Sequence, residues 1–151
     1  DEFEIVDKAG YYKCAGVGGG ITGRGFSVGI IDDPYKDEKD ANSATVSQAV
    51  WEWYTSTFLT REEGQGAIIL VLTRWTMHDL AARLLAEEPD EWTVLSLPAI
   101  AEGELHPDDP RKEGEALWPE TKTVEELMRL KRTLPVSQWQ ALYQQQPVPK
   151  G

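Results

Sequence analysis

Two adjacent carboxylates, Asp32 and Asp33, follow the apolar run Val28–Ile31 and are the first residues of this sequence that could do chemistry. A buried strand delivers the residues at its end to the carboxyl edge of a parallel sheet, where ligands bind. There the first carboxylate can hold Mg²⁺ through its water shell, and the second can orient or deprotonate an attacking water. This is the arrangement of a Walker B motif. The alternative is that the two acids and Pro34 form only a turn.

A second apolar run, Ala67–Leu72, ends in Thr73, Arg74 and Trp75. If the two strands are parallel neighbours joined by a helical crossover, Thr73 lies at the same sheet edge as Asp32. The polar ends of neighbouring strands would then form a site. Considered singly, Arg74 is expected to pair with one of the 26 acidic side chains, and Trp75 is expected to pack in the interior.

The segment Gly16–Gly25 contains six of the 13 glycines, which indicates a loop shaped by its backbone. Its spacing is similar to that of a phosphate loop with Arg24 in place of the lysine. A phosphate loop, however, needs a helix directly after it and a Ser or Thr for Mg²⁺. Here Gly25 occupies that position and a strand follows. Two interpretations stay open: a tight connection between strands, or a loop that presents Arg24 to a phosphate bound by other residues.

The elements that would position these residues alternate between strands and helices, which predicts an α/β fold. The run 67–72 is continuously apolar, which predicts a strand covered on both faces. Thr76 and Asp79 are expected to form a capping box at the start of the helix 77–88, with Thr76 as the cap and Asp79 reaching back. Strands are predicted at 11–17, 26–31, 67–72 and 92–97, helices at 44–59 (capped by Ser43), 77–88, 124–132 (capped by Thr123) and 137–146, and an irregular loop at 101–119.

Composition excludes several classes of protein. The chain has 151 residues, 40% of them hydrophobic, and a net charge of −11, which argues against a free-standing nucleic-acid binder. No apolar run approaches the roughly 20 residues that span a bilayer, so no membrane association is expected. The single cysteine, Cys14, cannot form an internal disulfide, which favours the cytoplasm. We expect Cys14 to be buried.

Five motifs in order together resemble the large terminase subunit of tailed bacteriophages. They are Gly16–Gly25, Ile30–Pro34, Leu72–Trp75 with Asp79-Leu80 and Arg83-Leu84, Glu115–Pro119, and Leu142–Pro147. The resemblance implies a motor that packages viral DNA into a procapsid, with an N-terminal ATPase of the additional-strand P-loop class and a C-terminal nuclease.

The resemblance also implies roles for residues. Asp32 would be the Mg²⁺ carboxylate and Asp33 the general base for ATP hydrolysis. Thr73 would belong to the coupling motif that senses the γ-phosphate, and Arg24 would be an arginine finger acting on a neighbouring subunit. The implied partners are double-stranded DNA, the portal protein, the small terminase subunit and further copies in a homo-oligomeric ring, all in the cytoplasm of a bacterial host.

The resemblance further implies that residues 1–143 are the second half of the ATPase domain and that residues 144–151 lead toward a nuclease domain. The expected fold is a three-layer, mostly parallel P-loop sheet, incomplete because the Walker A half is missing. The isolated chain is then expected to be inactive, and oligomeric or rearranged. Two alternatives remain: a metal-dependent nuclease built on Asp32 and Asp33, and a non-catalytic interaction module.

Overall fold

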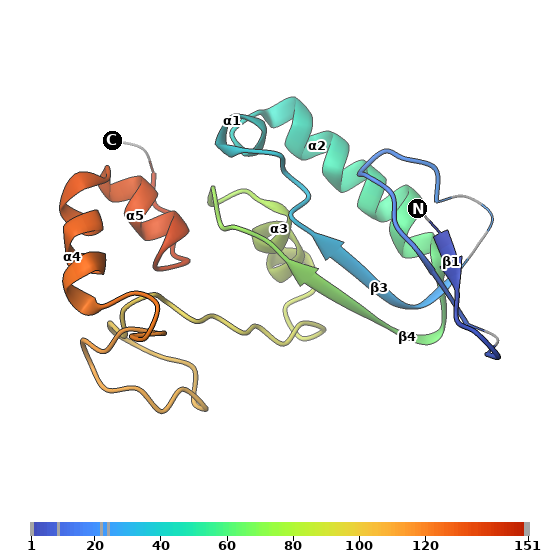
Figure 1. The fold of residues 1–151 in the computed structure, drawn as a ribbon. Helices are drawn as coiled ribbons and strands as arrows, with labels where there is room; N and C mark the ends of the chain where they lie inside the picture. Colours follow the sequence, from blue (N-terminus) through green and yellow to red (C-terminus); the bar gives the residue numbers. More distant parts are fainter. Residues whose placement is uncertain (1, 9, 22, 24, 150–151) are drawn as a thin grey trace.

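The computed structural model describes residues 2–8, 10–21, 23 and 25–149 (Figure 1). It has an α/β fold with a small parallel sheet and helices, as predicted. None of the helices in these ranges is long and apolar enough to cross a membrane. The elements in chain order are β1 (Glu2–Glu4), β2 (Tyr11–Lys13), β3 (Phe26–Asp32), α1 (Glu38–Ala41), α2 (Ala44–Trp53), a π-helical turn (Tyr54–Phe58), a 3-10 turn (Leu59–Arg61), β4 (Glu62–Val71), α3 (Leu80–Glu87), α4 (Val124–Thr133) and α5 (Val136–Leu142).

Strands β3 and β4 are hydrogen-bonded neighbours and run parallel, with Asp32 opposite Val71. Parallel neighbours need a long crossover between them, and α2 lies in that connection. The helix begins where the sequence predicts, because the Ser43 side chain accepts a hydrogen bond from the Val46 amide. The prediction that these two strands are parallel neighbours is confirmed.

The N-terminal residues form a separate hairpin in which β1 and β2 pair antiparallel. The rings of Phe3 and Tyr12 stack across it with centroids 4.9 Å apart. The strand predicted over residues 11–17 is shorter, covering only Tyr11–Lys13. The expected burial of Cys14 is wrong, since this residue is exposed. A two-stranded ribbon encloses no interior in which the thiol could be buried.

One face of the β3–β4 sheet is covered by helices. Ile31 of β3 belongs to the same buried cluster as Val50 of α2. Aromatic rings from β3 itself and from the π-helical turn leave no room for a side chain at Gly29. A Cβ atom at this position would lie 2.6 Å from the rings of both Phe26 and Phe58. The sheet and its helices therefore form one tightly packed core.

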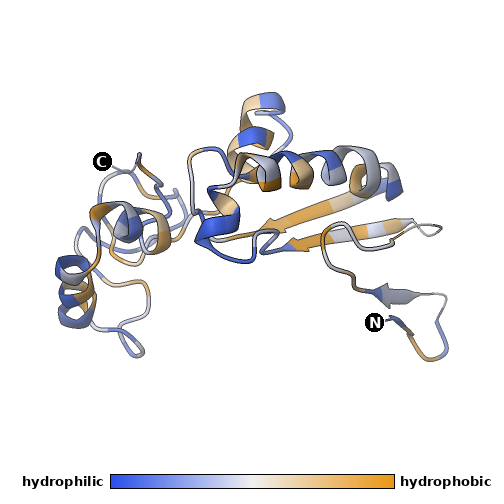
Figure 2. Cartoon of the chain, turned by 90° about the horizontal axis from the view of Figure 1, so that it is seen from above, coloured by the Kyte–Doolittle hydropathy of each residue, from blue (hydrophilic) through white to orange (hydrophobic). Residues whose placement is uncertain are grey.

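The opposite face of the same sheet is bare. Its side chains Val28, Ile30, Ile69 and Val71 are between 47% and 58% exposed. Figure 2 shows the hydrophobic strands with helices along one side only. The prediction that strand 67–72 is covered on both faces is therefore wrong for the described residues. No second helical layer of the expected three-layer arrangement is present in this part of the chain.

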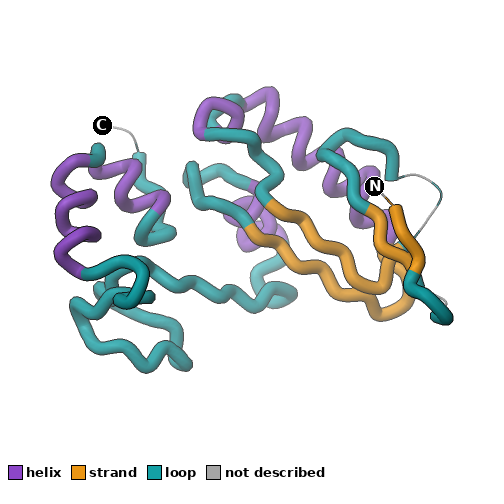
Figure 3. Tube along the Cα trace, in the orientation of Figure 1, coloured by secondary structure: helices purple, strands orange, loops and turns teal. Residues whose placement is uncertain are grey.

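The predicted strand 92–97 is also wrong, because these residues follow an irregular path (Figure 3). A strand needs a neighbour that pairs with its amides and carbonyls. Within the described ranges no other strand lies beside this segment. Val94 and Leu95 consequently remain exposed.

A second, smaller core lies between α4, α5 and the chain around Ile100. Trp139 is its largest buried side chain and stacks on Tyr143 with ring centroids 5.0 Å apart. The capping box predicted at Thr123 is confirmed, since its side chain and that of Glu126 each accept from the other's backbone amide. Helix α5 begins after Pro135, slightly earlier than predicted, and ends at Leu142 rather than at residue 146.

Two adjacent glutamine side chains hold the extended residues that precede this core. The Gln144 amide group accepts a hydrogen bond from the Ile100 amide at 3.1 Å and donates one to the Ile100 carbonyl at 3.0 Å. The Gln145 amide group makes the same pair of contacts with Leu97, at 3.2 and 3.3 Å. Gln144 and Gln145 therefore belong to the folded unit, while a linker function for residues 144–151 stays a prediction.

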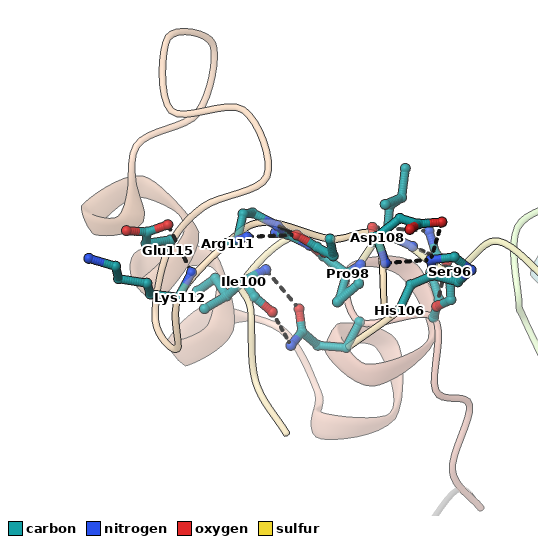
Figure 4. Close-up of polar contacts among 12 residues, drawn as sticks. Ser96, Pro98, Ile100, His106, Asp108, Arg111, Lys112 and Glu115 are labelled. Carbon is teal, nitrogen blue, oxygen red and sulfur yellow. Dashed lines mark hydrogen bonds and ion pairs between the residues drawn. The ribbon is translucent and has the colours of Figure 1, made fainter. Parts of the chain in front are cut away.

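The loop over residues 101–119 is irregular, as predicted, and Arg111 fastens it to the rest of the second core (Figure 4). The Arg111 guanidinium donates to the Pro98 carbonyl at 2.8 Å and to both carboxylate oxygens of Asp109. Hydrogen bonding from Arg111 holds the pKa of Asp109 below its ordinary value. The loop is thus fixed by this ion pair together with a short backbone bridge between Ile100 and Ala116.

Candidate active site

The carboxyl ends of β3 and β4 meet at one edge of the sheet. Asp32 is the last residue of β3 and pairs with Val71, the last residue of β4. Asp33 follows β3 directly, and Thr73 follows β4 after one intervening residue, Leu72. The prediction that Thr73 lies at the same edge as Asp32 is therefore confirmed, and the two carboxylates stand beside the loop that begins at Thr73.

Asp33 joins the two strand ends through both its backbone and its side chain. Its backbone amide donates to the Val71 carbonyl at 2.9 Å, and its Oδ1 accepts from the Thr73 amide at 2.9 Å. The φ angle of Asp33 is +42°, in the left-handed region that aspartate tolerates better than most residues. This turn directs the carboxylate across to Thr73.

Asp32 is exposed at the strand end, and its carboxylate has no hydrogen bond or ion pair within residues 2–8, 10–21, 23 and 25–149. An exposed carboxylate of this kind can accept the water shell of Mg²⁺. No group of three or more His, Cys, Asp or Glu side chains gathers among the described residues to enclose a metal ion. The described residues therefore do not form an enclosed metal site at this sheet edge.

Arg74, next to Thr73, pairs with an acid as the sequence suggests. Its Nε donates to Asp79 Oδ2 at 2.7 Å. The other oxygen of Asp79 accepts from the Ala82 amide at 2.9 Å and caps α3. The capping role predicted for Thr76 is therefore wrong. Its hydroxyl accepts instead from the nearby His78 amide, and α3 begins later, at Leu80.

Tyr35, two residues after Asp33, is buried. Burial raises the pKa of the Tyr35 hydroxyl, the nearby Ser47 hydroxyl and Leu80 amide lower it, and the negative charge of Asp79 raises it further. The charge of Asp79, which pairs with Arg74 after β4, thus also acts on a buried residue after β3.

The glycine-rich loop leads into β3 and not into a helix, which agrees with the rejection of a phosphate loop. Gly18 and Gly23 have φ angles of +78° and +87°, which only glycine adopts without strain. Arg24 lies outside the described residues. Its predicted role as an arginine finger stays a prediction.

Sequence reasoning placed Asp79 second in a capping box, and it missed that Asp79 is itself the cap and the partner of Arg74; it also missed Tyr35. An aspartate directly before the run Leu80–Leu85 is a helix-capping signal, but Thr76 offered a competing one. Arg74 distinguishes the two candidate caps, Asp79 and Thr76. A guanidinium that folds inward needs a carboxylate partner, and of these two residues only Asp79 has one. Tyr35 has no sequence signal beyond its place after the two acids.

Comparison with protein families gives one assignment. The family model described as "Terminase large subunit, T4likevirus-type, N-terminal" matches residues 6–142. No curated protein matches the sequence significantly. The matched residues include both strands of the parallel sheet, Asp32, Asp33 and Thr73. The chain therefore belongs to the large terminase subunits of the T4-like type, a family with a role in packaging phage DNA.

Proposed function

We propose that this chain forms the hydrolytic and coupling part of an ATPase that drives DNA into a phage procapsid. Asp33 orients or deprotonates the attacking water, and Asp32 contributes to binding of Mg²⁺. Thr73 senses the γ-phosphate. The observation that carries the proposal is the 2.9 Å hydrogen bond from the Thr73 amide to Asp33 Oδ1.

This hydrogen bond supports the proposal for a physical reason. A general base must be fixed in orientation, yet must keep a lone pair for the water that it activates. The backbone amide of Thr73 holds one carboxylate oxygen of Asp33 and leaves the second for water. Because the same residue is proposed to sense phosphate, a shift of Thr73 would turn the base. ATP occupancy and water activation would then change together.

The exposed carboxylate of Asp32 suits Mg²⁺ bound through water. The ion would neutralise phosphate charge during the reaction. Asp32 supplies a negative charge beside Asp33 at the strand end, and its lack of a protein partner among the described residues leaves it available for this purpose.

The phosphate loop is, in this proposal, supplied by residues other than these 151. The bare face made by Val28, Ile30, Ile69 and Val71 supports this, because parallel sheets are normally covered on both faces. Residues 92–97, which have no neighbouring strand among the described residues, support it also. The chain alone would then be inactive.

Arg24 is proposed to reach the nucleotide of a neighbouring subunit in a homo-oligomeric ring. The glycines around it would allow the loop to be shaped by that neighbour. The portal protein and the small terminase subunit are the proposed protein partners. A net charge of −11 repels DNA. Binding of double-stranded DNA is therefore assigned to other segments or to a local basic patch.

The decisive experiment is Asp33→Asn in the large subunit polypeptide that carries these residues together with a phosphate loop. Asparagine keeps the oxygen that faces the Thr73 amide and tolerates a positive φ, so the fold is preserved while the base is lost. We expect ATP hydrolysis to be abolished and nucleotide binding to be retained. The matched control is Asp90→Asn, a substitution of an exposed acid after α3. Unchanged hydrolysis in Asp33→Asn would refute the assignment.

The nuclease alternative receives less support. Two-metal nucleases use several carboxylates around the ions. Asp32 and Asp33 have no third such group beside them within the described ranges. Metal-dependent DNA cleavage by this chain would reverse the preference. No observation on this chain favours a purely non-catalytic interaction module.

A further inference from the structure

Asp79 is more deeply buried than a helix cap requires. Its side chain is 0% exposed, although charged caps ordinarily lie at the surface. One oxygen accepts from the Ala82 amide at 2.9 Å, and the other accepts from Arg74 Nε at 2.7 Å. A buried carboxylate is tolerated only when its lone pairs are satisfied. The burial therefore depends on Arg74 as well as on the helix.

Arg74 belongs to a loop in which each of three consecutive residues is fixed. The Thr73 amide donates to Asp33, and the Thr73 carbonyl accepts from the Trp75 amide at 2.9 Å. Arg74, between them, is held by Asp79. Thr73 and Arg74 are consecutive, so the contact between Arg74 and Asp79 anchors the loop one residue after the Thr73 amide that bonds Asp33.

The loop after β3 is anchored at the same place. Tyr35, two residues after Asp33, is 4% exposed, and its hydroxyl lies near the carboxylate of Asp79 and the amide of Leu80. Asp79 thus joins the loop after β4 to the start of α3, and its charge acts on the buried hydroxyl of Tyr35 in the loop after β3.

We propose that Asp79 is a positioning residue for the strand-end site, holding Arg74 so that the Thr73 amide keeps the Asp33 carboxylate oriented. The inference rests on the proposed function for its effect on hydrolysis. Its structural part, the dependence of the Asp33–Thr73 contact on Asp79, is testable separately. A residue that served only as a helix cap would affect α3 and leave Thr73 unchanged.

The first test is amide hydrogen exchange of the ¹⁵N-labelled chain, measured by NMR, with the variant Asp79→Asn. Asparagine caps helices as well as aspartate does, but removes the charge that pairs with Arg74. We expect the Thr73 amide to exchange about tenfold faster, and the Val50 amide in α2 to be unaffected. The matched control is Thr123→Ala, which removes the cap of the remote α4 and should leave Thr73 unchanged. An unaltered Thr73 exchange rate in Asp79→Asn overturns the proposal.

A measurement on the unsubstituted chain covers the case in which the variant does not fold. If Asp79 couples the loop to the helix, the Thr73 and Ala82 amides must open in one event and respond equally to low concentrations of urea. Independent opening of Thr73, with a weaker urea dependence than Ala82, overturns the proposal.

The last test is kinetic and uses the large subunit polypeptide with a phosphate loop. For Asp79→Asn we expect kcat to fall about tenfold with KM for ATP within about twofold, because an orienting contact is lost and no ATP contact is removed. An unchanged kcat overturns the proposal for Asp79. Unchanged hydrolysis in Asp33→Asn overturns the proposed function instead, so the two failures are distinguishable.

Discussion

Replacing Gln144 with alanine removes a side chain that takes the place of a β-strand. On one side of residues 99–101 the neighbours are backbone groups, since the Ala101 amide donates to the Glu115 carbonyl and the Leu117 amide to the Ala99 carbonyl. On the other side the Ile100 amide and carbonyl meet only the Gln144 side chain. Water cannot replace it readily, because Ile100 is 2% exposed and Gln144 is 4% exposed.

The magnitude follows from the two backbone groups that lose their partner. Each buried amide or carbonyl left without a hydrogen bond costs about 1–3 kcal/mol, so Gln144→Ala should lower the free energy of unfolding by about 2–6 kcal/mol. Domains of this size are stable by only about 5–15 kcal/mol. The second core should therefore be severely weakened.

The assay is urea unfolding followed by circular dichroism, with the midpoint and the slope m fitted separately. The matched control is Gln146→Ala, two residues further on, whose side chain is exposed and which should change stability by no more than about 0.5 kcal/mol. Gln144→Glu separates hydrogen bonding from packing. Glutamate can accept from the Ile100 amide, but it brings a carboxylate toward the Ile100 carbonyl and Glu102. It should therefore be no better than alanine at neutral pH. If Gln144→Ala unfolds within about 0.5 kcal/mol of the unsubstituted chain, the reasoning is wrong.

Two further predictions concern the first core. Burial, and secondarily the charges of Glu88 and Glu62, raise the pKa of Tyr54 to about 12. The unfolded chain, with an ordinary tyrosine pKa of about 10, therefore loses this proton first, and stability should fall between pH 10 and 12 by up to about 1.4 kcal/mol per pH unit. Urea unfolding across this range should show a shallower fall for Tyr54→Phe, and an identical pH profile would contradict the prediction. Gly29→Ala places a methyl group 2.6 Å from two phenylalanine rings and should cost about 1–3 kcal/mol in the same assay. Gly16→Ala, where nothing lies within 4 Å, is the neutral comparison, and equal effects would exclude steric overlap as the cause.

Where local signals and burial agree, the sequence was sufficient for prediction. β3 and β4 are apolar runs that end in polar residues, and their shared edge followed from parallel topology alone. Ser43 was predicted as a cap from its residue type before an amphipathic run, and Thr123 because Glu126 completes a capping box. Both side chains accept from the amide three residues further on.

Predictions failed where structure depends on what lies beside a segment. Residues 92–97 have the composition of a strand, but a strand exists only when a neighbour pairs with it. The continuous apolarity of Ala67–Leu72 indicates burial on both faces, yet only one face is covered by the described residues. The contact between Asp79 and Arg74 was missed because a buried ion pair leaves no periodic pattern in the sequence.

The hydrogen bond between Thr73 and Asp33 joins residues 40 positions apart in the sequence. It therefore bears on how the chain folds. Hairpins and helices form within microseconds, because their contacts are local. Pairing β3 with β4 requires closing the whole crossover, and such non-local contacts slow folding. The helix α2 and the β1–β2 hairpin are thus expected to form early, and the strand-end site only when the crossover closes. Asp33 and Thr73 become neighbours in this slow step. The site proposed to hydrolyse ATP is therefore complete only after β3 and β4 have paired.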